Sequence, residues 1–334
     1  MVSAVIFVAT SCVSPLTGFA FWETNLAYEG ESIYNYLQVK NLSDRTILST
    51  NVLFGVQSVT MKDKGLTGMY YDTALAAPAL ADNANSALIL GMGTGTYARQ
   101  LKQYYPKMNI TGVEIDQKIT DLAGEYFDEP ADIPVTTYDG RAWLAASHDK
   151  YDVIMVDAYQ DITIPFQMSF TEFFTMVREH LNPGGVMVVN MNMISDGQGS
   201  INEALSDTIA SVFGNGNTLT ADVPNTTNRE LFAKKPGSGS EENSMQQASK
   251  ALNLRETTYE RTGSEDLEWY MEEVASRFRK VNEPDSASTI LTDDKAPVEV
   301  LGMHAIDQII ADEAGPYRQI LKDEGFGGLL RAVQ

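Results

Sequence analysis

The sequence predicts an α/β fold built on a parallel, doubly wound sheet. Apolar segments of strand length alternate with segments of helical periodicity between residues 87 and 190. Several of these strands run into a glycine or an acidic residue at their carboxyl ends. In doubly wound sheets those ends meet at one edge, which is where ligands bind. We therefore expect a ligand site at that edge.

The first strand of this unit ends in a glycine-rich loop. The apolar segment 88–90 precedes the loop, and helical periodicity follows it over 97–105. Glycine allows a sharp turn and a close approach of the backbone to a ligand, and the helix behind the loop presents unpaired N–H groups. We expect cofactor contacts from the loop residues Gly91, Gly93, Thr94 and Gly95.

The next strands end in acids. Glu114 lies about twenty residues beyond the glycine loop, where an acid can bind a ribose diol. Asp139 follows the third strand and precedes Gly140 and a helical segment, and Asp157 ends the fourth strand, 151–157. This series indicates a nucleoside-containing cofactor. The third glycine of the loop follows the second by two residues rather than three, so the dinucleotide fingerprint of NAD enzymes is not matched.

This order of motifs resembles the S-adenosylmethionine-dependent transferases and, within them, the spermidine synthase (aminopropyltransferase) family. Gln57 stands where that family has a glutamine in a β-hairpin. Residues 70–72 stand where it has a Tyr-His-Glu-type motif that opens a helix. Segments 157–165 and 291–299 resemble the branch of the family that is fused to, or follows, membrane segments.

The resemblance implies a Rossmann-like S-adenosylmethionine-dependent methyltransferase fold. It also implies decarboxylated S-adenosylmethionine as the co-substrate, a polyamine such as putrescine as the acceptor, and a homodimer. In the site that it implies, Asp139 contacts the adenine amino group, and the other cofactor-binding residues include Gly140 and Gln57.

Aminopropyl transfer is an in-line attack by an amine on the carbon next to a sulfonium, which is already a good leaving group. The amine is mostly protonated at neutral pH, so the site needs a carboxylate that takes a proton and fixes the amine. Asp157 and Asp161 lie on the loop after the fourth strand and can supply that base. We expect the wall that faces the amine to consist of Tyr70, Tyr71, Asp72 and Asp157.

Two positions depart from the family pattern. Thr94 replaces the aspartate of a Gly-Gly-Gly-Asp-Gly loop, which in the family helps to hold the aminopropyl end of the co-substrate. Asp157 and Asp161 are four residues apart instead of three, and Gln160 stands where the second acid would align. Two alternatives therefore stay open: a methyltransferase that uses intact S-adenosylmethionine, and a non-catalytic polyamine- or nucleoside-binding domain.

The composition narrows the classes of ligand. The chain has 334 residues, a hydrophobic content of 43% and a formal net charge of −21. A surface that acidic disfavours nucleic acid and anionic lipid, and it is compatible with polycationic substrates. The single cysteine, Cys12, and three scattered histidines offer no metal-ligand spacing, so we expect no metal site.

The sequence divides into three parts. Residues 1–27 form an apolar N-terminal segment, 28–68 a small antiparallel β unit, and 69–334 the Rossmann-like domain with a helical tail. A linker over 22–36 is predicted to lead into the β unit. Residues 3–21 carry no charge and are long enough to cross a bilayer. We expect them to anchor a cytoplasmic domain to a membrane, the alternative being a buried or disordered N-terminal arm.

Local patterns predict the remaining elements. Short strands are predicted over 34–40, 45–50 and 52–60, and an antiparallel strand pair over 218–223 and 229–234. Helices are predicted over 70–80, 244–253 and 264–280.

Overall fold

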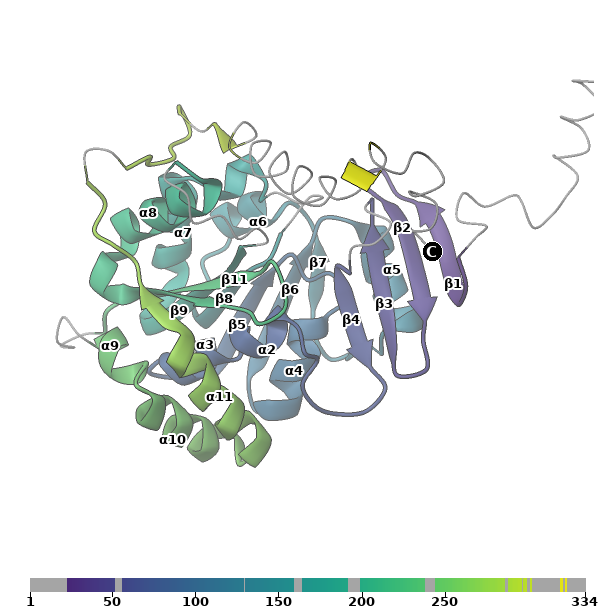
Figure 1. The fold of residues 1–334 in the computed structure, drawn as a ribbon, viewed down its shortest axis with the longest axis horizontal. Helices are drawn as coiled ribbons and strands as arrows, with labels where there is room; N and C mark the ends of the chain where they lie inside the picture. Colours follow the sequence, from purple (N-terminus) through teal and green to yellow (C-terminus); the bar gives the residue numbers. More distant parts are fainter. Residues whose placement is uncertain are drawn as a thin grey trace, which may run out of the picture.

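The computed structural model describes residues 23–51, 56–128, 130–158, 164–191, 199–237, 244–285, 288–295, 297–298, 301, 319–320 and 322. These residues form two sheets, an antiparallel one near the N-terminus and a larger, mostly parallel one (Figure 1). Helices cover both faces of the larger sheet. The α/β class predicted from the sequence is therefore confirmed.

The N-terminal sheet has four strands in the order β1-β2-β3-β4, each antiparallel to the next. The strands are β1 (Leu26–Glu31), β2 (Tyr36–Asn41), β3 (Arg45–Thr50) and β4 (Ser58–Met61). The predicted antiparallel unit is present, but the linker prediction over 22–36 was wrong because β1 lies inside it. This edge strand has no fully buried residue, so it lacks the apolar alternation that marks a strand in sequence.

The main sheet has eight strands in the order β12-β10-β11-β9-β8-β5-β6-β7. They are β5 (Ser86–Leu90), β6 (Asn109–Glu114), β7 (Val135–Thr137), β8 (Tyr151–Val156), β9 (Leu181–Met191), β10 (Thr218–Asp222), β11 (Arg229–Lys234) and β12 (Phe278–Lys280). Strands β5 to β9 run parallel, and β10, β11 and β12 pair antiparallel. The predicted pair formed by β10 and β11 is confirmed.

A different set of helices covers each face of this sheet (Figure 1). One face packs under α2 (Tyr70–Ala74), α3 (Ala76–Leu80), α4 (Thr96–Tyr104), α9 (Ser244–Ala248), α10 (Ala251–Thr262) and α11 (Glu265–Arg277). The opposite face packs under α6 (Gly140–Ala146), α7 (Thr171–His180) and α8 (Ile201–Phe213). Two short 3-10 helices, η2 (Phe166–Met168) and η3 (Asn215–Asn217), lie in connections.

Three helix predictions need correction. The predicted helix over 70–80 is divided by a turn at Leu75 into α2 and α3. The helix predicted over 244–253 is α9 followed by the start of α10, and the one predicted over 264–280 ends at Arg277. The chain then forms β12, which adds to the edge of the main sheet beside β10. β12 has one half-buried and two exposed residues and follows directly on α11, so nothing in its sequence marks it as a strand.

The strand order places the glycine loop and the acid-ended strands around one crevice. β5 lies between β6 and β8, so the chain reverses its direction of travel across the sheet at β5. Parallel sheets bind ligands at such a switch point, outside the carboxyl ends of the strands. Gly91, Glu114 and Asp157, which stand at the ends of these three strands, are therefore brought together.

The N-terminal sheet is joined to the main domain through α5 (Gln117–Tyr126). Leu37 and Leu48 of that sheet pack on Leu122 of the helix in a separate buried cluster. A polar contact adds to this packing, because Asp116 accepts hydrogen bonds from the hydroxyl of Ser32 (2.6 Å) and the amide of Asn35 (2.9 Å). These contacts hold the loop between β1 and β2 against the main sheet.

The apolar segment 3–21, predicted to be a membrane anchor, lies outside the described residues. Within the part of the chain that the structure does describe, none of the helices has the length and apolar character needed to span a bilayer.

Candidate active site

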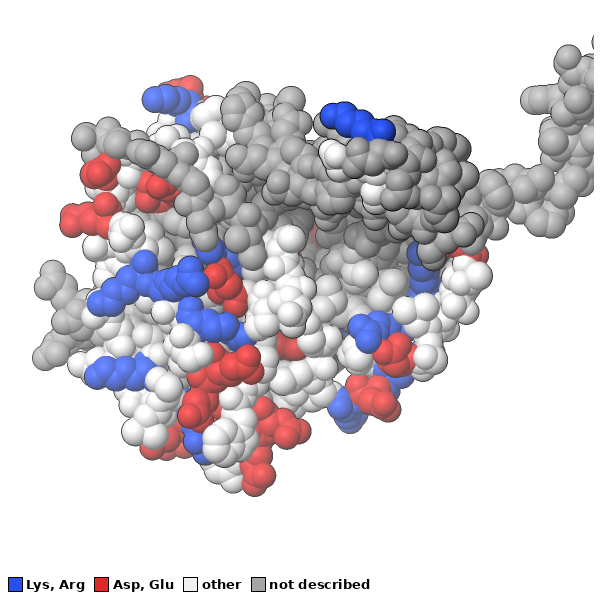
Figure 2. Space-filling view, viewed as in Figure 1, with Lys and Arg blue, Asp and Glu red and all other residues white. Residues whose placement is uncertain are grey.

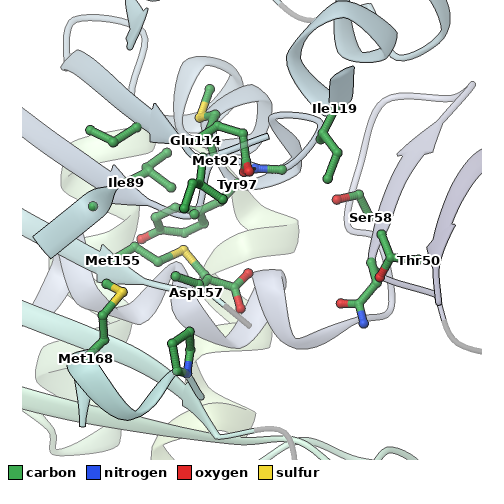
Figure 3. A pocket seen from close by; sticks show the side chains of 18 of the residues that line it. Thr50, Ser58, Ile89, Met92, Tyr97, Glu114, Ile119, Met155, Asp157 and Met168 are labelled. Atoms are coloured by element: carbon green, nitrogen blue, oxygen red, sulfur yellow. The ribbon is translucent and has the colours of Figure 1, made fainter. Parts of the chain in front are cut away.

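A cavity of about 330 Å³ opens at the carboxyl edge of the main sheet. The N-terminal sheet forms one wall of it, through Thr50 and Ser58, and the ends of the parallel strands form the other (Figure 3). Asp157 points into the space between these walls, with Met155 and Met168 beside it. The volume is in the range of pockets that hold small molecules.

Most residues predicted from the sequence line this cavity. Those that do are Gln57, Tyr70, Tyr71, Gly91, Gly93, Glu114, Asp139, Gly140 and Asp157. Three predicted residues, Asp72, Thr94 and Gly95, are not part of its lining. Asp161 and Gln160 lie outside the described residues.

The glycine loop is shaped by contacts that a side chain would prevent. Gly91 has a φ of +86°, and a Cβ atom there would lie 2.4 Å from the carbonyl oxygen of Asp157. Glycine is therefore required both for the backbone conformation and for the close approach of the two strand ends. The N–H of Gly93 donates to Oε2 of Glu114 (2.8 Å), which ties the loop to the end of β6.

Thr94 and Gly95 have structural places in this loop. Gly95 is the residue before α4 and takes the left-handed conformation, with a φ of +79°. Thr94 is fully buried, and its hydroxyl has no hydrogen-bond partner among the described residues. Thr94 is therefore not part of the described cavity wall, and its expected contact with the cofactor stays a prediction.

Glu114 is held by backbone amides at the end of β6. Its Oε1 accepts from the N–H of Asp116 (3.0 Å), and its Oε2 accepts from Gly93. Burial raises the pKa of Glu114, and the hydrogen bonds from these amides oppose that increase. A carboxylate fixed at this edge has lone pairs left for the hydroxyls of a ribose.

Asp157 is a buried carboxyl with two protein donors. Tyr70 donates its hydroxyl to Oδ2 (2.6 Å), and Asn190 donates its amide to Oδ1 (2.9 Å). Burial raises the pKa of Asp157 to about 7, the two hydrogen bonds lower it, and the nearby charge of Glu114 raises it. A carboxyl of this kind can gain and lose a proton near neutral pH, which suits it for acid–base chemistry.

Tyr70 and Tyr71 form an aromatic wall at the start of α2. Their ring centroids are 4.0 Å apart, and both rings line the cavity. The hydroxyl of Tyr71 donates to the carbonyl of Gln57 (2.8 Å), so Tyr71 fixes the backbone immediately before β4. Aromatic faces of this kind can accept the ammonium groups of an amine.

Asp72 has a different place from the one predicted. Its carboxylate is buried and accepts hydrogen bonds from the backbone and hydroxyl of Thr67, from the N–H of Gly68 and from Gln100. These donors fix the loop that leads into α2. Asp72 therefore supports the position of Tyr70 and Tyr71 and is not part of the cavity wall.

Asp139 and Gly140 lie at the start of α6. The side chain of Asp139 accepts from the N–H of Ala142 (2.8 Å), so it caps the helix, and one face of it still lines the cavity. Arg141 forms a bidentate ion pair with Asp293 (2.8 and 2.9 Å) and also donates to the carbonyl of Gln167 (2.9 Å). This pairing ties the tail of the chain to the loop that carries the cavity residues Gln167 and Met168.

Two buried polar residues, on β9 and β11, have almost no signal in the sequence. Asn190 at the end of β9 and Glu230 on β11 are buried polar residues inside apolar strands. No glycine loop, motif or spacing marks them, and the only sign is that a polar residue interrupts a buried strand. The described residues contain no cluster of three or more histidine, cysteine or acidic side chains arranged to hold a metal.

Comparison with known proteins places this chain in a family. The spermine/spermidine synthase domain matches residues 69–235. A probable polyamine aminopropyl transferase of Bifidobacterium longum (strain NCC 2705) is 99% identical over 334 residues, which are all of this chain and 75% of that protein. A polyamine aminopropyltransferase of Vibrio vulnificus (strain CMCP6) is 28% identical over 209 residues, which are 60% of this chain and 69% of that protein.

Solved structures agree on the fold. A probable spermidine synthase from Corynebacterium glutamicum has a TM-score of 0.56 and 22% identity, covering 80% of this chain and 99% of that one. A spermidine synthase in complex with the transition-state analogue AdoDATO has a TM-score of 0.53 and 19% identity, covering 64% and 75%. The Rossmann-like fold is thus shared with these enzymes. From the domain match and the near-identical relative, this chain belongs to the spermine/spermidine synthase family, the polyamine aminopropyltransferases.

Proposed function

We propose that this chain moves the aminopropyl group of decarboxylated S-adenosylmethionine to an amine such as putrescine, with Asp157 as the proton acceptor. One observation carries the proposal. Asp157 is a buried carboxyl at the switch point of the sheet, held by Tyr70 and Asn190, with a pKa raised to about 7. A base with that pKa can take a proton from a bound ammonium near neutral pH.

The charge of the cavity supports a cationic co-substrate. Its described lining includes three acids, Glu114, Asp139 and Asp157, and no lysine, arginine or histidine. Intact S-adenosylmethionine carries a carboxylate that such a lining repels, whereas the decarboxylated form carries only positive charges beyond its nucleoside. This favours aminopropyl transfer over methyl transfer.

The residues then divide the work of the reaction. Glu114 binds the ribose, Asp139 and Gly140 bind the adenine, and the glycine loop lets the nucleoside approach the end of β5. The amine nitrogen attacks the carbon next to the sulfonium, the carbon–sulfur bond breaks, and methylthioadenosine leaves with the electron pair on its sulfur. Asp157 accepts the proton that the new ammonium or the incoming amine gives up. Positioning of the two reactants supplies much of the rate.

A binding and turnover experiment on the full chain tests this function. Calorimetric titration compares decarboxylated S-adenosylmethionine, S-adenosylmethionine and methylthioadenosine, and an assay then follows release of methylthioadenosine after putrescine is added. We expect the decarboxylated form to bind more tightly than the intact one and putrescine to trigger release. Tighter binding of the intact form would favour the methyltransferase, and binding without turnover would favour a polyamine or nucleoside sensor.

The family resemblance also implies a homodimer, and the uncharged segment 3–21 predicts a membrane anchor. A homodimer gives twice the chain mass of 36.7 kDa in light scattering, and a monomer contradicts it. The anchor predicts that the full chain floats with lipid vesicles and that a chain without residues 1–27 does not.

A further inference from the structure

Glu230 is a buried acid that the proposed reaction leaves without a role. It is the second residue of β11 and has no solvent exposure. Neither of its carboxyl oxygens has a hydrogen-bond partner among the described residues. Burying a carboxyl without a donor costs free energy, so such a group in a folded protein needs an explanation.

The sheet register places Glu230 in one row with Asp157. Glu230 pairs directly with Asn190 across β11 and β9, and Asn190 donates its amide to Asp157 (2.9 Å). Residues directly opposite each other on neighbouring strands point to the same face of a sheet. The row therefore runs from Asp157 through Asn190 to Glu230, on the face that α2 and α4 cover.

Among the described residues, no cationic side chain forms a hydrogen bond with the carboxyl of Glu230. Burial raises the pKa of Glu230, and the charge of Asp157 raises it further. The charge of Glu230 in turn raises the pKa of Tyr97 on α4. Asn190, its neighbour in the row, donates to Asp157 and accepts from Asn228 (2.9 Å). Tyr97 and Asp157 both line the cavity, so Glu230 lies directly behind the cavity wall.

We propose that Glu230 is a positioning residue, the second counter-charge for the cationic amine that binds beside Asp157. It touches no substrate atom, and its negative charge acts on the bound amine over a distance, from behind the cavity wall. This inference rests on the proposed function, because it deepens the account of how that site selects a polycation. Two carboxyls in one buried row each disfavour the ionised form of the other, so ionising both is costly unless a cation joins them. A bound diamine supplies that cation, so both acids lose their protons when it arrives.

The test substitutes Glu230→Gln, which keeps the shape and removes the charge. Putrescine is titrated into protein saturated with methylthioadenosine, which measures amine affinity without any need for turnover. We expect the Kd for putrescine to rise on the order of tenfold, as for unit charges about 10 Å apart at an effective dielectric constant of about 20. The Kd for methylthioadenosine alone should not change, and fewer protons should be released when putrescine binds.

Two matched variants separate charge from structure. Glu230→Asp keeps the carboxyl and should retain putrescine affinity within about threefold, since the charge stays in the row. Asp207→Asn removes another buried acid, on α8 at the opposite face of the sheet, whose pKa burial also raises. It should leave putrescine binding unchanged.

The unfolding temperature of Glu230→Gln distinguishes an electrostatic role of Glu230 from a structural one, because the two roles predict changes of opposite sign. Burial raises the pKa of Glu230 in the folded state above its unfolded value of about 4.3, so the carboxyl destabilises the fold above that pH. Glu230→Gln should therefore unfold at the same or a higher temperature at pH 8, and the gain should vanish as the pH falls below about 4.

The outcomes are distinct. Wild-type putrescine affinity in Glu230→Gln, or equal loss in Glu230→Asp and Glu230→Gln, overturns the role of charge at this position. A lower unfolding temperature of Glu230→Gln at pH 8 means that the side chain is structural, which also overturns it. Failure of the wild type to turn over decarboxylated S-adenosylmethionine, with putrescine affinity still dependent on Glu230, overturns the proposed function alone.

Discussion

At the scale of single residues, the reaction depends on when Asp157 loses its proton. Its pKa of about 7 means that the carboxyl is mostly protonated at pH 6 and mostly ionised at pH 8. Because the ionised form is the base, kcat/KM should rise about tenfold per pH unit below pH 7 and level off above it. Asp157→Asn should lower kcat/KM by about 10² to 10⁴ and remove this limb of the profile. A flat profile between pH 5.5 and 8 would contradict the assignment.

The hydroxyl of Tyr70 affects the pKa of Asp157. The hydrogen bond to Asp157 favours the ionised carboxylate and so lowers its pKa. Tyr70→Phe removes the bond, so the acid limb of the kcat/KM profile should move to higher pH, and activity at pH 7 should fall about tenfold. Tyr71→Phe is the control, because the Tyr71 hydroxyl donates to the carbonyl of Gln57 instead. An unchanged pH profile in Tyr70→Phe would separate Tyr70 from the proton transfer.

The sequence predicted the residues of the site that stand at strand ends. Gly91, Glu114 and Asp157 each stand at the carboxyl end of a predicted strand, and parallel topology gathers such positions at one edge. It did not predict Glu230, because an acid inside a strand has no local mark. The sequence also led us to expect Asp72 in the wall that faces the amine. The donors that hold this carboxylate away from the cavity include Gln100, which lies on another helix and is not adjacent in sequence.

At the scale of elements, the loop between β5 and α4 depends on one glycine more than on the others. Gly91→Ala forces a side chain into a left-handed backbone conformation and against the backbone of Asp157. We expect a loss of roughly 2–4 kcal/mol in the free energy of unfolding and a loss of methylthioadenosine binding, because the ends of β5 and β8 must separate. Denaturant unfolding and calorimetry measure the two effects.

Gly124→Ala is the matched control for that loop variant. Gly124 lies inside α5, where a Cβ atom would meet no other atom within 4 Å. Replacing glycine in a helix interior should increase stability by about 0.5–1 kcal/mol and leave nucleoside binding intact. Equal damage from both substitutions would mean that the constraint at Gly91 is not local.

The central strands of the main sheet were predicted, and the edge strands β1 and β12 were not. The parallel strands β5 and β8 have apolar runs because both of their faces are covered by helices. Strands β1 and β12 lie at sheet edges and have few buried residues, so only tertiary pairing defines them. The break between α2 and α3 has a local cause instead, because Pro78 has no N–H to donate to the carbonyl of Ala74 and its ring crowds that carbonyl.

At the scale of the whole molecule, the net charge of −21 bears on how the amine arrives. Figure 2 shows acidic side chains gathered over α10 and α11, the helices that carry Glu256, Glu260, Glu265, Asp266, Glu268, Glu272 and Glu273. A field of this sign attracts a dication, and salt screens it.

That field makes substrate binding dependent on salt. The KM for putrescine should increase several-fold between about 20 and 300 mM NaCl, because the Debye length shortens across this range. The inhibition constant of methylthioadenosine, which carries no net charge, is the internal control and should stay constant. A KM for putrescine that does not respond to salt would confine the attraction to the cavity itself.

The most direct test of aminopropyl transfer is the identity of the product. The full chain is given equal amounts of S-adenosylmethionine and its decarboxylated form together with putrescine, and mass spectrometry follows the nucleoside released. We expect methylthioadenosine and spermidine in equal amounts, with both formed at least about a hundredfold more slowly in Asp157→Asn. Release of S-adenosylhomocysteine with a methylated amine instead would contradict the proposed reaction.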